Sequence, residues 1–271
     1  ALGGRNSPTI GYAAFVPPFH LERDKGKAKA VGGLFWDGRA DSLEAQARGP
    51  LFSPLEMNLA GEADLAQRLR SAPYAGELRA AFGLAETADD AQWARTGYAA
   101  VAAYQRSPEV SPFSSKYDAV LRGEAKFSAQ EARGRRLFLD PVKGNCAACH
   151  AIANRSKDPA EHLFTDFTYD NLGLPRNVAK RPFLFHNGSF TDLADAVRFY
   201  VQRDTRPQEW YPRRASGRLA MFDDLPRGMT RNVNRDEAPY DRKPGQRPRL
   251  SEREIFDLVV FLKTLDDGFQ P

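Results

Sequence analysis

The sequence predicts a mainly α-helical protein made of two helical domains with long loops. Apolar residues recur with helical spacing in six stretches, and two of these begin at a capping box. The 19 prolines and 21 glycines indicate that the loops are long. The periodicity breaks over 107–126, so we place the boundary there and expect domains over 1–115 and 116–271.

Four of the helices belong to the first domain. They are expected over 42–48, 63–71, 75–82 and 90–106. Pro73 separates the second from the third, because proline cannot continue a helix. The fourth is rich in alanine, and its large side chains are spaced for one buried stripe: Trp93, Tyr98, Val101 and Tyr104.

The second domain is expected to contain two longer helices and one irregular segment. Ser128 and Glu131 form a capping box that opens a helix reaching about Leu139. Ser251 and Glu254 open the last helix, whose predicted apolar face consists of Ile255, Leu258, Val259, Leu262 and Leu265. Residues 201–250 show almost no periodicity, which is typical of a functional or surface-wrapping segment. No internal repeat or low-complexity tract is found.

Composition and charge exclude several classes of protein. The apolar and charged fractions, 42% and 27%, are those of a globular protein and exclude a disordered or fibrous chain. The net charge is 39 − 35 = +4 and is evenly spread, which does not predict nucleic-acid binding. No apolar run reaches the roughly 20 residues of a membrane span. No signal peptide is visible at Ala1, so the chain is expected to be a mature one.

The only two cysteines lie in the pentapeptide Cys146-Ala147-Ala148-Cys149-His150. This C-x-x-C-H spacing is the attachment signature of a c-type haem. The two thiols add to the haem vinyl groups, and the adjacent histidine binds the iron as the proximal ligand. We therefore expect haem c on Cys146 and Cys149 with His150 on the iron. Since such attachment occurs outside the cytoplasm, the sequence predicts a periplasmic protein.

Three other interpretations of the cysteines compete. A thioredoxin-type redox pair needs a βαβ context, which the flanking sequence does not suggest. A zinc site needs two further ligands from His20, His162 and His186, none of which is in a paired spacing. A disulfide across two residues would be strained.

Several blocks of sequence resemble the bacterial di-haem cytochrome c peroxidase family, which includes MauG. In the first half these are 5–9 (RNSPT), 35–43 (FWDGRADSL), Gln46, 49–50 and 55–58 (LEMN). In the second half they are 146–150, 164–166 (FTD), 171–173 (NLG), 186–193 (HNGSFTDL) and 258–265. The blocks follow the family order over nearly the whole chain.

The resemblance implies two cytochrome c-like domains and two haems, and this sequence departs from it twice. The family's first C-x-x-C-H lies upstream of the RNSPT block, so the first domain is expected to be truncated at its N-terminus. That domain would be the remainder of the peroxidatic haem domain, and the second would be the c-type haem domain. The run 174–178 looks shorter than the family pattern.

The resemblance also implies residues that act on peroxide. Glu56 matches the family's acid/base glutamate, and Gln46 matches the glutamine beside it in the distal pocket. Trp36 matches the tryptophan that carries electrons between the haems. Judged without the family, Glu56 and Gln46 would be solvated helix residues and Trp36 a buried structural residue.

The resemblance also implies two metal ligands, Tyr200 for the iron of the second haem and Asn6 for calcium. Tyr200, fourteen residues after His186, falls at the distal position of the second haem. Methionine there raises the haem potential, whereas an anionic tyrosine, as in MauG, favours higher oxidation states. Tyr200 could equally be a core residue of an amphipathic helix. His186 has a structural interpretation too, as a partner of a haem propionate or a loop carbonyl.

Asn6 matches a ligand of the family's calcium site, but one amide oxygen is far fewer than the 6–8 that calcium takes. The residues expected as partners before His186 are altered to Lys180, Arg181 and Pro182.

The resemblance thus predicts a periplasmic di-haem c-type peroxidase-like oxidoreductase. Its partners would be hydrogen peroxide and a small electron-donor protein or a protein substrate, with no nucleic acid and no membrane span. Members of the family often form dimers, so a homodimer is expected. The alternative is a single-haem c-type electron-transfer protein without peroxide chemistry, since the 271 residues carry one C-x-x-C-H.

Overall fold

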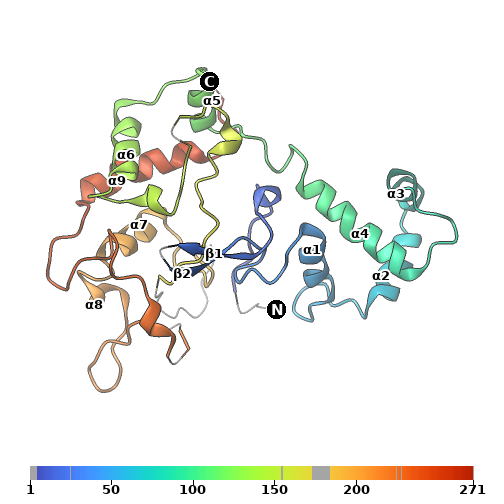
Figure 1. Ribbon diagram of the computed structural model, residues 1–271, viewed down its shortest axis with the longest axis horizontal. Helices are drawn as coiled ribbons and strands as arrows, with labels where there is room; N and C mark the ends of the chain where they lie inside the picture. Colours follow the sequence, from blue (N-terminus) through green and yellow to red (C-terminus); the bar gives the residue numbers. More distant parts are fainter. Residues whose placement is uncertain are drawn as a thin grey trace. The chain divides into compact units, whose positions relative to one another are not determined.

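The computed structural model describes residues 5–24, 26–153, 155–172, 184–223, 225–226 and 228–270. It is mainly helical, which confirms the predicted fold class (Figure 1). The chain divides into two compact units, Ala1–Pro112 and Phe113–Pro271, and the division falls inside the segment 107–126 where the periodicity breaks.

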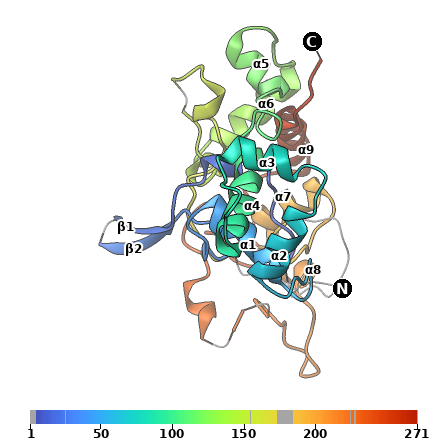
Figure 2. The same cartoon turned by 90° about the vertical axis from the view of Figure 1, so that its right-hand side faces the viewer.

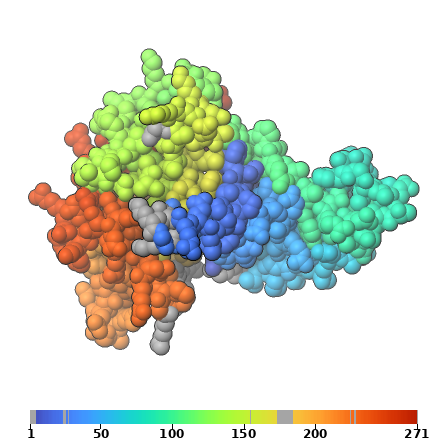
Figure 3. Space-filling view, in the orientation of Figure 1, coloured from blue at the N-terminus to red at the C-terminus, as the bar shows by residue number. Residues whose placement is uncertain are grey.

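The first unit contains the four expected helices. They are α1 (Leu43–Phe52), α2 (Glu62–Arg70), α3 (Ala75–Phe82) and α4 (Asp90–Gln105). The helices α1 and α2 pack against α4, and α2 to α4 form one lobe of the surface (Figure 3, cyan). The first helix is longer than the predicted 42–48 because it continues through Pro50. The carbonyls of Pro50 and Leu51 accept bonds from Met57 and Leu59 at 3.1 and 2.9 Å, which hold the chain that follows against the helix end.

The buried face of α4 differs from the predicted stripe. Trp93 and Tyr98 are buried, but Val101 and Tyr104 are 41% and 47% exposed. The core side is completed by small residues, among them Gly97, where an added Cβ would lie 2.9 Å from Leu69 Cδ1. A stripe predicted from large side chains alone was therefore wrong for its last two members, because small residues allow α2 to pack closely on α4.

A β-hairpin that the sequence did not predict precedes these helices. The strands β1 (His20–Asp24) and β2 (Lys27–Val31) pair antiparallel, with His20 opposite Val31. The hairpin projects from its unit (Figure 2). It is the one sheet found among the residues that the structure describes.

The second unit contains α5 (Lys116–Arg122), α6 (Ala129–Leu139), α7 (Leu193–Gln202), α8 (Pro207–Trp210) and α9 (Glu252–Leu262). Both predicted capping boxes form, at Ser128 and at Ser251. The helices α6 and α9 pack closely at Gly134, where an added Cβ would lie 2.1 Å from the Asp257 carbonyl oxygen. Of the predicted apolar face of α9, Ile255, Leu258 and Val259 are buried.

The segment 201–250 is more ordered than its composition suggests. Arg203 is completely buried, donates to the Leu172 carbonyl at 2.7 Å and to Asp204 Oδ2 at 2.8 Å, and also donates to the Asn234 carbonyl. Its guanidinium lies 4.4 Å from the centre of the Tyr240 ring. The segment is therefore folded around a buried cation rather than laid over the surface, which periodicity cannot indicate.

The structure also contains a short repeat. Residues 34–43 and 184–193, offset by 150, share one backbone conformation: a bridged turn followed by a capped helix. The matching features are the bridges Leu34–Ala40 and Leu184–Phe190, the positive φ of Phe35 (65°) and Phe185 (66°), that of Gly38 (68°) and Gly188 (65°), and the N-caps Ser42 and Asp192. The expectation of no internal repeat was therefore wrong on this short scale.

Candidate haem site

The C-x-x-C-H pentapeptide forms a tight turn at the end of the segment that follows α6. Asn145 has a left-handed φ of 51°, and its side-chain amide donates to the Ala238 carbonyl at 3.1 Å. A 3₁₀ turn follows over Cys146–Ala148, and the His150 amide donates to the Cys146 carbonyl at 2.8 Å. The turn brings both thiols and the imidazole into one short stretch of chain.

The imidazole of His150 is oriented by a second hydrogen bond. Its Nδ1 lies 3.0 Å from the Phe164 carbonyl oxygen. Because a carbonyl can only accept, we assign the proton to Nδ1, which leaves the lone pair of Nε2 for a metal. This is the arrangement by which metal-binding histidines are usually held in one tautomer.

The alternatives to haem attachment agree poorly with this geometry. Cys146 and Cys149 are not joined in a disulfide, and burial raises the pKa of Cys146 to about 12, whereas redox-active pairs need a lowered thiol pKa. Among the described residues, no three His, Cys, Asp or Glu side chains lie together as metal ligands. His162 is buried and bonds to Tyr117 and Ser156, and His20 lies in the hairpin beside Glu22.

Tyr200 lies on α7 near the two thiols. Burial raises the pKa of its phenol well above the usual value, and the charges of Cys146 and Cys149 raise it further. Its ring packs 5.6 Å from that of Phe185 and 6.0 Å from that of Tyr240.

The residues around the motif suit a haem. The core cluster of the second unit takes in partly buried apolar residues beside the motif: Cys146, Ala147, Phe164, Leu193, Ala194 and Tyr200. Two thiols, an imidazole with a free Nε2 and an apolar wall are the donor set and surroundings that a c-type haem requires.

In the first unit, Trp36 lies on the repeated turn 34–43 and is 39% exposed. Its indole N–H donates to the Asn6 carbonyl at 2.7 Å. The neighbouring Asp37 carboxylate pairs with Arg5 and Arg39, each at 2.8 Å. The blocks at 5–9 and 35–43 are thus held together, and the indole has a fixed orientation.

Glu56 and Gln46 come from adjacent elements. Gln46 is half-buried on α1, and Glu56 is exposed on the turn that follows it. Both residues are among those that the structure describes, and no hydrogen bond or ion pair joins the Glu56 and Gln46 side chains. Glu56 stands between Leu55 and Met57, which are 53% and 61% exposed.

The calcium prediction gains no support from geometry. Asn6 is half-buried and accepts the Trp36 indole bond through its carbonyl. The altered partners Lys180, Arg181 and Pro182, and the short run 174–178, lie outside the described residues. Calcium therefore stays a prediction.

Some contributors to this site were not expected from the sequence. They are the carbonyl of Phe164, the left-handed Asn145 and the ring of Tyr240. The Phe164 carbonyl acts through the backbone, which carries no residue-specific signal. Asn145 directly precedes the motif, and asparagine's tolerance of the left-handed region was the one available signal.

Comparison with known proteins shows one consistent likeness. The family model described as di-haem cytochrome c peroxidase matches residues 1–126. The methylamine utilization protein MauG of Paracoccus denitrificans is 36% identical over 307 aligned positions, covering 98% of this chain and 75% of that protein. Because 307 positions exceed the 271 residues, the Paracoccus protein has residues within this span that the chain lacks.

Two further relatives agree. The cytochrome c551 peroxidase of Pseudomonas aeruginosa is 30% identical, covering 72% of this chain and 57% of that protein. The crystal structure of the diheme peroxidase BthA from Burkholderia thailandensis matches with a TM-score of 0.88 and 36% identity, covering 98% of this chain and 73% of that one.

Proposed function

The chain belongs to the family of di-haem cytochrome c peroxidases and MauG proteins, and from this premise we propose that it reduces hydrogen peroxide or uses it to oxidise a partner protein. As a member it is a peroxidase-like oxidoreductase with haem c as cofactor. When bound, haem c supplies an iron that accepts and releases single electrons.

The observation that carries the proposal is the donor set of the second unit. Cys146 and Cys149 offer two thiols, and His150 offers Nε2 because its Nδ1 is engaged by Phe164 at 3.0 Å. Cys146 and Cys149 would attach the haem, and His150 would bind the iron on its proximal side. Tyr200, which is half-buried on α7 near both thiols, is our candidate for the opposite iron position.

The first unit would supply the peroxide chemistry. Glu56 is our candidate to move a proton between the two peroxide oxygens, and Gln46, on the preceding helix α1, is our candidate to orient the peroxide. Trp36 is our candidate electron relay, with its indole fixed by the Asn6 carbonyl at 2.7 Å. Asn6 is the candidate for a calcium ligand.

We infer the cellular compartment from the chemistry of haem attachment, and the kind of partner from the expected iron ligand. Thioether attachment occurs outside the cytoplasm, so we propose the periplasm. Among the residues that the structure describes, no helix has the length and apolarity to cross a membrane. The partner would be a small electron-donor protein or a protein substrate. A tyrosine at position 200 favours the second, since an anionic ligand disfavours a simple electron store.

A second candidate function is that of a single-haem c-type electron-transfer protein without peroxide chemistry, for which the thiols of Cys146 and Cys149 and the imidazole of His150 would suffice. Such a carrier would hold iron in a purely low-spin state that does not respond to peroxide.

The test is rapid mixing of the haem-loaded protein with hydrogen peroxide. We expect Glu56→Gln to slow peroxide consumption by about 10²–10⁴-fold, the usual value of one general acid–base group. Glu77→Gln, an exposed acid of α3 in the same unit, is the matched control and should react like the unmodified protein. Equal rates in all three would remove Glu56 as the acid–base group, and spectra unaffected by peroxide would favour the carrier.

A further inference from the structure

The second unit contains a buried tyrosine–histidine pair that the proposed function does not use. Tyr117, on α5, is 1% exposed, and His162 is 5% exposed. The Tyr117 hydroxyl lies 2.9 Å from His162 Nδ1. On the other side of the imidazole, Nε2 lies 3.1 Å from the Ser156 carbonyl oxygen.

This geometry fixes the direction of the hydrogen bond between the two side chains. The Ser156 carbonyl can only accept, so Nε2 carries the proton of the neutral imidazole. Nδ1 then has a lone pair and accepts from the Tyr117 hydroxyl. The phenol proton is therefore already directed at a base that can take it.

The pair is close to the haem site. The segment that carries His162 continues to Phe164, whose carbonyl orients His150. The Phe164 ring stands edge-on to the Tyr117 ring, with the ring centres 4.9 Å apart. Phe138 lies 5.6 Å from Phe164 and 6.4 Å from the His150 ring. One layer of aromatic side chains thus separates Tyr117 from the proximal histidine.

The charges around Tyr117 favour proton transfer to the histidine over formation of a phenolate. Burial raises the pKa of the Tyr117 phenol, and the Arg135 guanidinium offsets this only in part. Buried phenols lose an electron more readily when the proton leaves in the same step, because no charged phenolate or phenol cation has to be desolvated. His162 supplies the place for that proton.

We propose that Tyr117 is a redox-active residue that gives up one electron while its proton moves to His162 Nδ1. The O–H bond of Tyr117 breaks and an N–H bond forms on His162, which leaves a neutral tyrosyl radical and an imidazolium. Hydrogen peroxide is the oxidant: it takes two electrons and two protons to become two water molecules. One electron comes from Tyr117, the other comes from the electron-donor protein or protein substrate of the proposed function, and solvent supplies the two protons because the Tyr117 proton stays on His162. The inference rests on the proposed function for this supply of oxidant.

The first test is electron paramagnetic resonance of haem-loaded protein frozen shortly after mixing with peroxide. We expect an organic radical whose spectrum narrows when the protein contains ring-deuterated tyrosine. Tyr117→Phe keeps the ring and should lose the signal. Tyr98→Phe, which removes another buried hydroxyl that donates to Glu62 at 3.2 Å, should keep it. A signal that persists in Tyr117→Phe, or that does not narrow, would overturn the proposal.

A second variant separates the redox role from packing. His162→Asn retains a hydrogen-bond acceptor near the Nδ1 position but cannot hold a proton. We expect it to lose the radical while peroxide is still consumed. A radical yield equal to that of the unmodified protein would show that the pair is only structural.

A flash-excited ruthenium tris-bipyridine oxidant keeps this inference distinguishable from the proposed function. If peroxide is not consumed but the flash produces a radical that is absent in Tyr117→Phe, the pair is redox-active and the peroxidase proposal fails. If peroxide is consumed and neither oxidant gives a radical on Tyr117, the inference fails and the peroxidase proposal stands.

Discussion

The turns 34–43 and 184–193 share a backbone but differ in the chemistry that holds them. In the first, the exposed carboxylate of Asp37 pairs with Arg5 and Arg39. In the second, Asn187 stands at the same place, and its side-chain oxygen accepts from the Ser189 amide at 3.1 Å. The bridging residue is Ala40 in one turn and Phe190 in the other.

The two turns also differ in what they present. The first holds Trp36 at the surface of its unit, whereas the second packs Phe185 and Phe190 into a cluster with the fully buried Phe199. The shared part is therefore the path of the chain, with glycine at the same left-handed position. The side chains differ, so the same path of the chain presents an exposed indole in one unit and contributes to an aromatic core in the other.

The largest expected effect concerns the buried cation behind the second turn. Arg203→Met leaves the Asp204 carboxylate and two carbonyls without their donor, and should lower the free energy of unfolding by about 3–5 kcal/mol. Burial already raises the pKa of Asp204, despite the neighbouring Arg203. An acid with a raised pKa destabilises the fold only while it is ionised. The loss of unfolding free energy caused by Arg203→Met should therefore become smaller as the pH is lowered and Asp204 is protonated.

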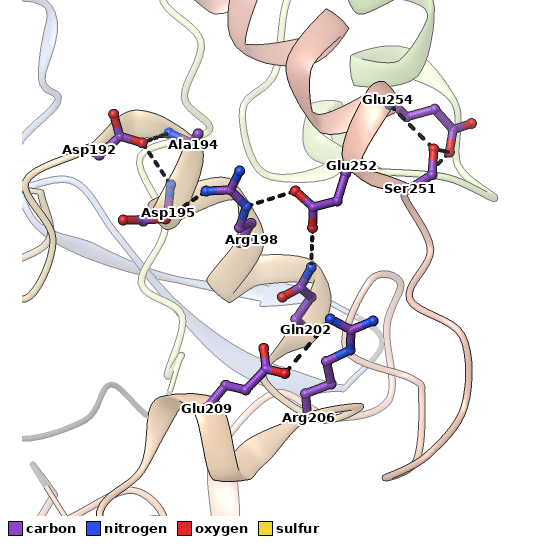
Figure 4. Close-up of polar contacts among 10 residues, drawn as sticks. All are labelled: Asp192, Ala194, Asp195, Arg198, Gln202, Arg206, Glu209, Ser251, Glu252 and Glu254. Carbon is purple, nitrogen blue, oxygen red and sulfur yellow. Dashed lines mark hydrogen bonds and ion pairs between the residues drawn. The ribbon is translucent and has the colours of Figure 1, made fainter.

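The matched control lies on α7, the helix that ends just before Arg203. Arg198 is a half-buried residue of α7 that pairs with Asp195 at 2.7 Å and with Glu252 at 2.9 Å, and Gln202 also donates to Glu252 (Figure 4). Arg198→Met should cost no more than about 1 kcal/mol in urea unfolding. Equal losses in the two variants would mean that Arg203 does not organise the segment 201–250.

A smaller effect tests the shared backbone. Gly188 has φ +65°, and no atom of the described residues lies within 4 Å of the position that a Cβ would take, so we expect Gly188→Ala to meet mainly backbone strain. We expect a loss of about 1 kcal/mol in unfolding free energy. Gly76→Ala, in helix α3 with equally open space, should instead stabilise by up to about 1 kcal/mol. A stabilised Gly188→Ala would show that the second turn does not need its left-handed residue.

The smallest effect is expected from Asp37→Asn, which gives the first turn the residue type that Asn187 provides in the second. Burial would raise the pKa of Asp37, but hydrogen bonds from Arg39 and Arg5 outweigh it, and the pKa is lowered. A lowered pKa contributes stability above the unfolded value of about 3.9, which is lost as the pH falls through the folded value. Because the carboxylate is 38% exposed, Asp37→Asn should cost less than about 1 kcal/mol at pH 7.

The pH dependence of unfolding checks this assignment. The difference in stability between Asp37→Asn and the unmodified protein should narrow as the pH falls below about 4. A difference that stays constant across that range would mean that the ionised carboxylate of Asp37, and with it the two ion pairs, does not contribute to stability.

Local signals predicted much of this fold. Capping residues marked the starts of α6 and α9, and Pro73 marked the break between α2 and α3, because each acts within one helical turn. The hairpin β1–β2 and the exposure of Val101 and Tyr104 were not predicted. Both features depend on how the rest of the unit packs against these segments, and the residue types within the segments do not determine that packing.

The candidate site, like the fold, has a part that could be predicted from the sequence and a part that could not. Five consecutive residues, 146–150, carry the attachment chemistry, so the thiols and the imidazole could be predicted directly. The partners that orient them come from distant segments, such as the Phe164 carbonyl and the Ala238 carbonyl that holds Asn145. The repeat at an offset of 150 shares Leu, Phe, Gly and Leu at four positions, which is too short a match to stand out in sequence alone.

The central claim is that Cys146, Cys149 and His150 hold a covalent haem. Trypsin cleavage after Lys143 and Arg155 releases the peptide 144–155, which contains both cysteines of the chain. Its mass in protein made with the cytochrome c maturation system tests the claim most directly. We predict a peptide heavier by one haem whose thiols resist alkylation. An unmodified peptide with two alkylated cysteines would contradict the account.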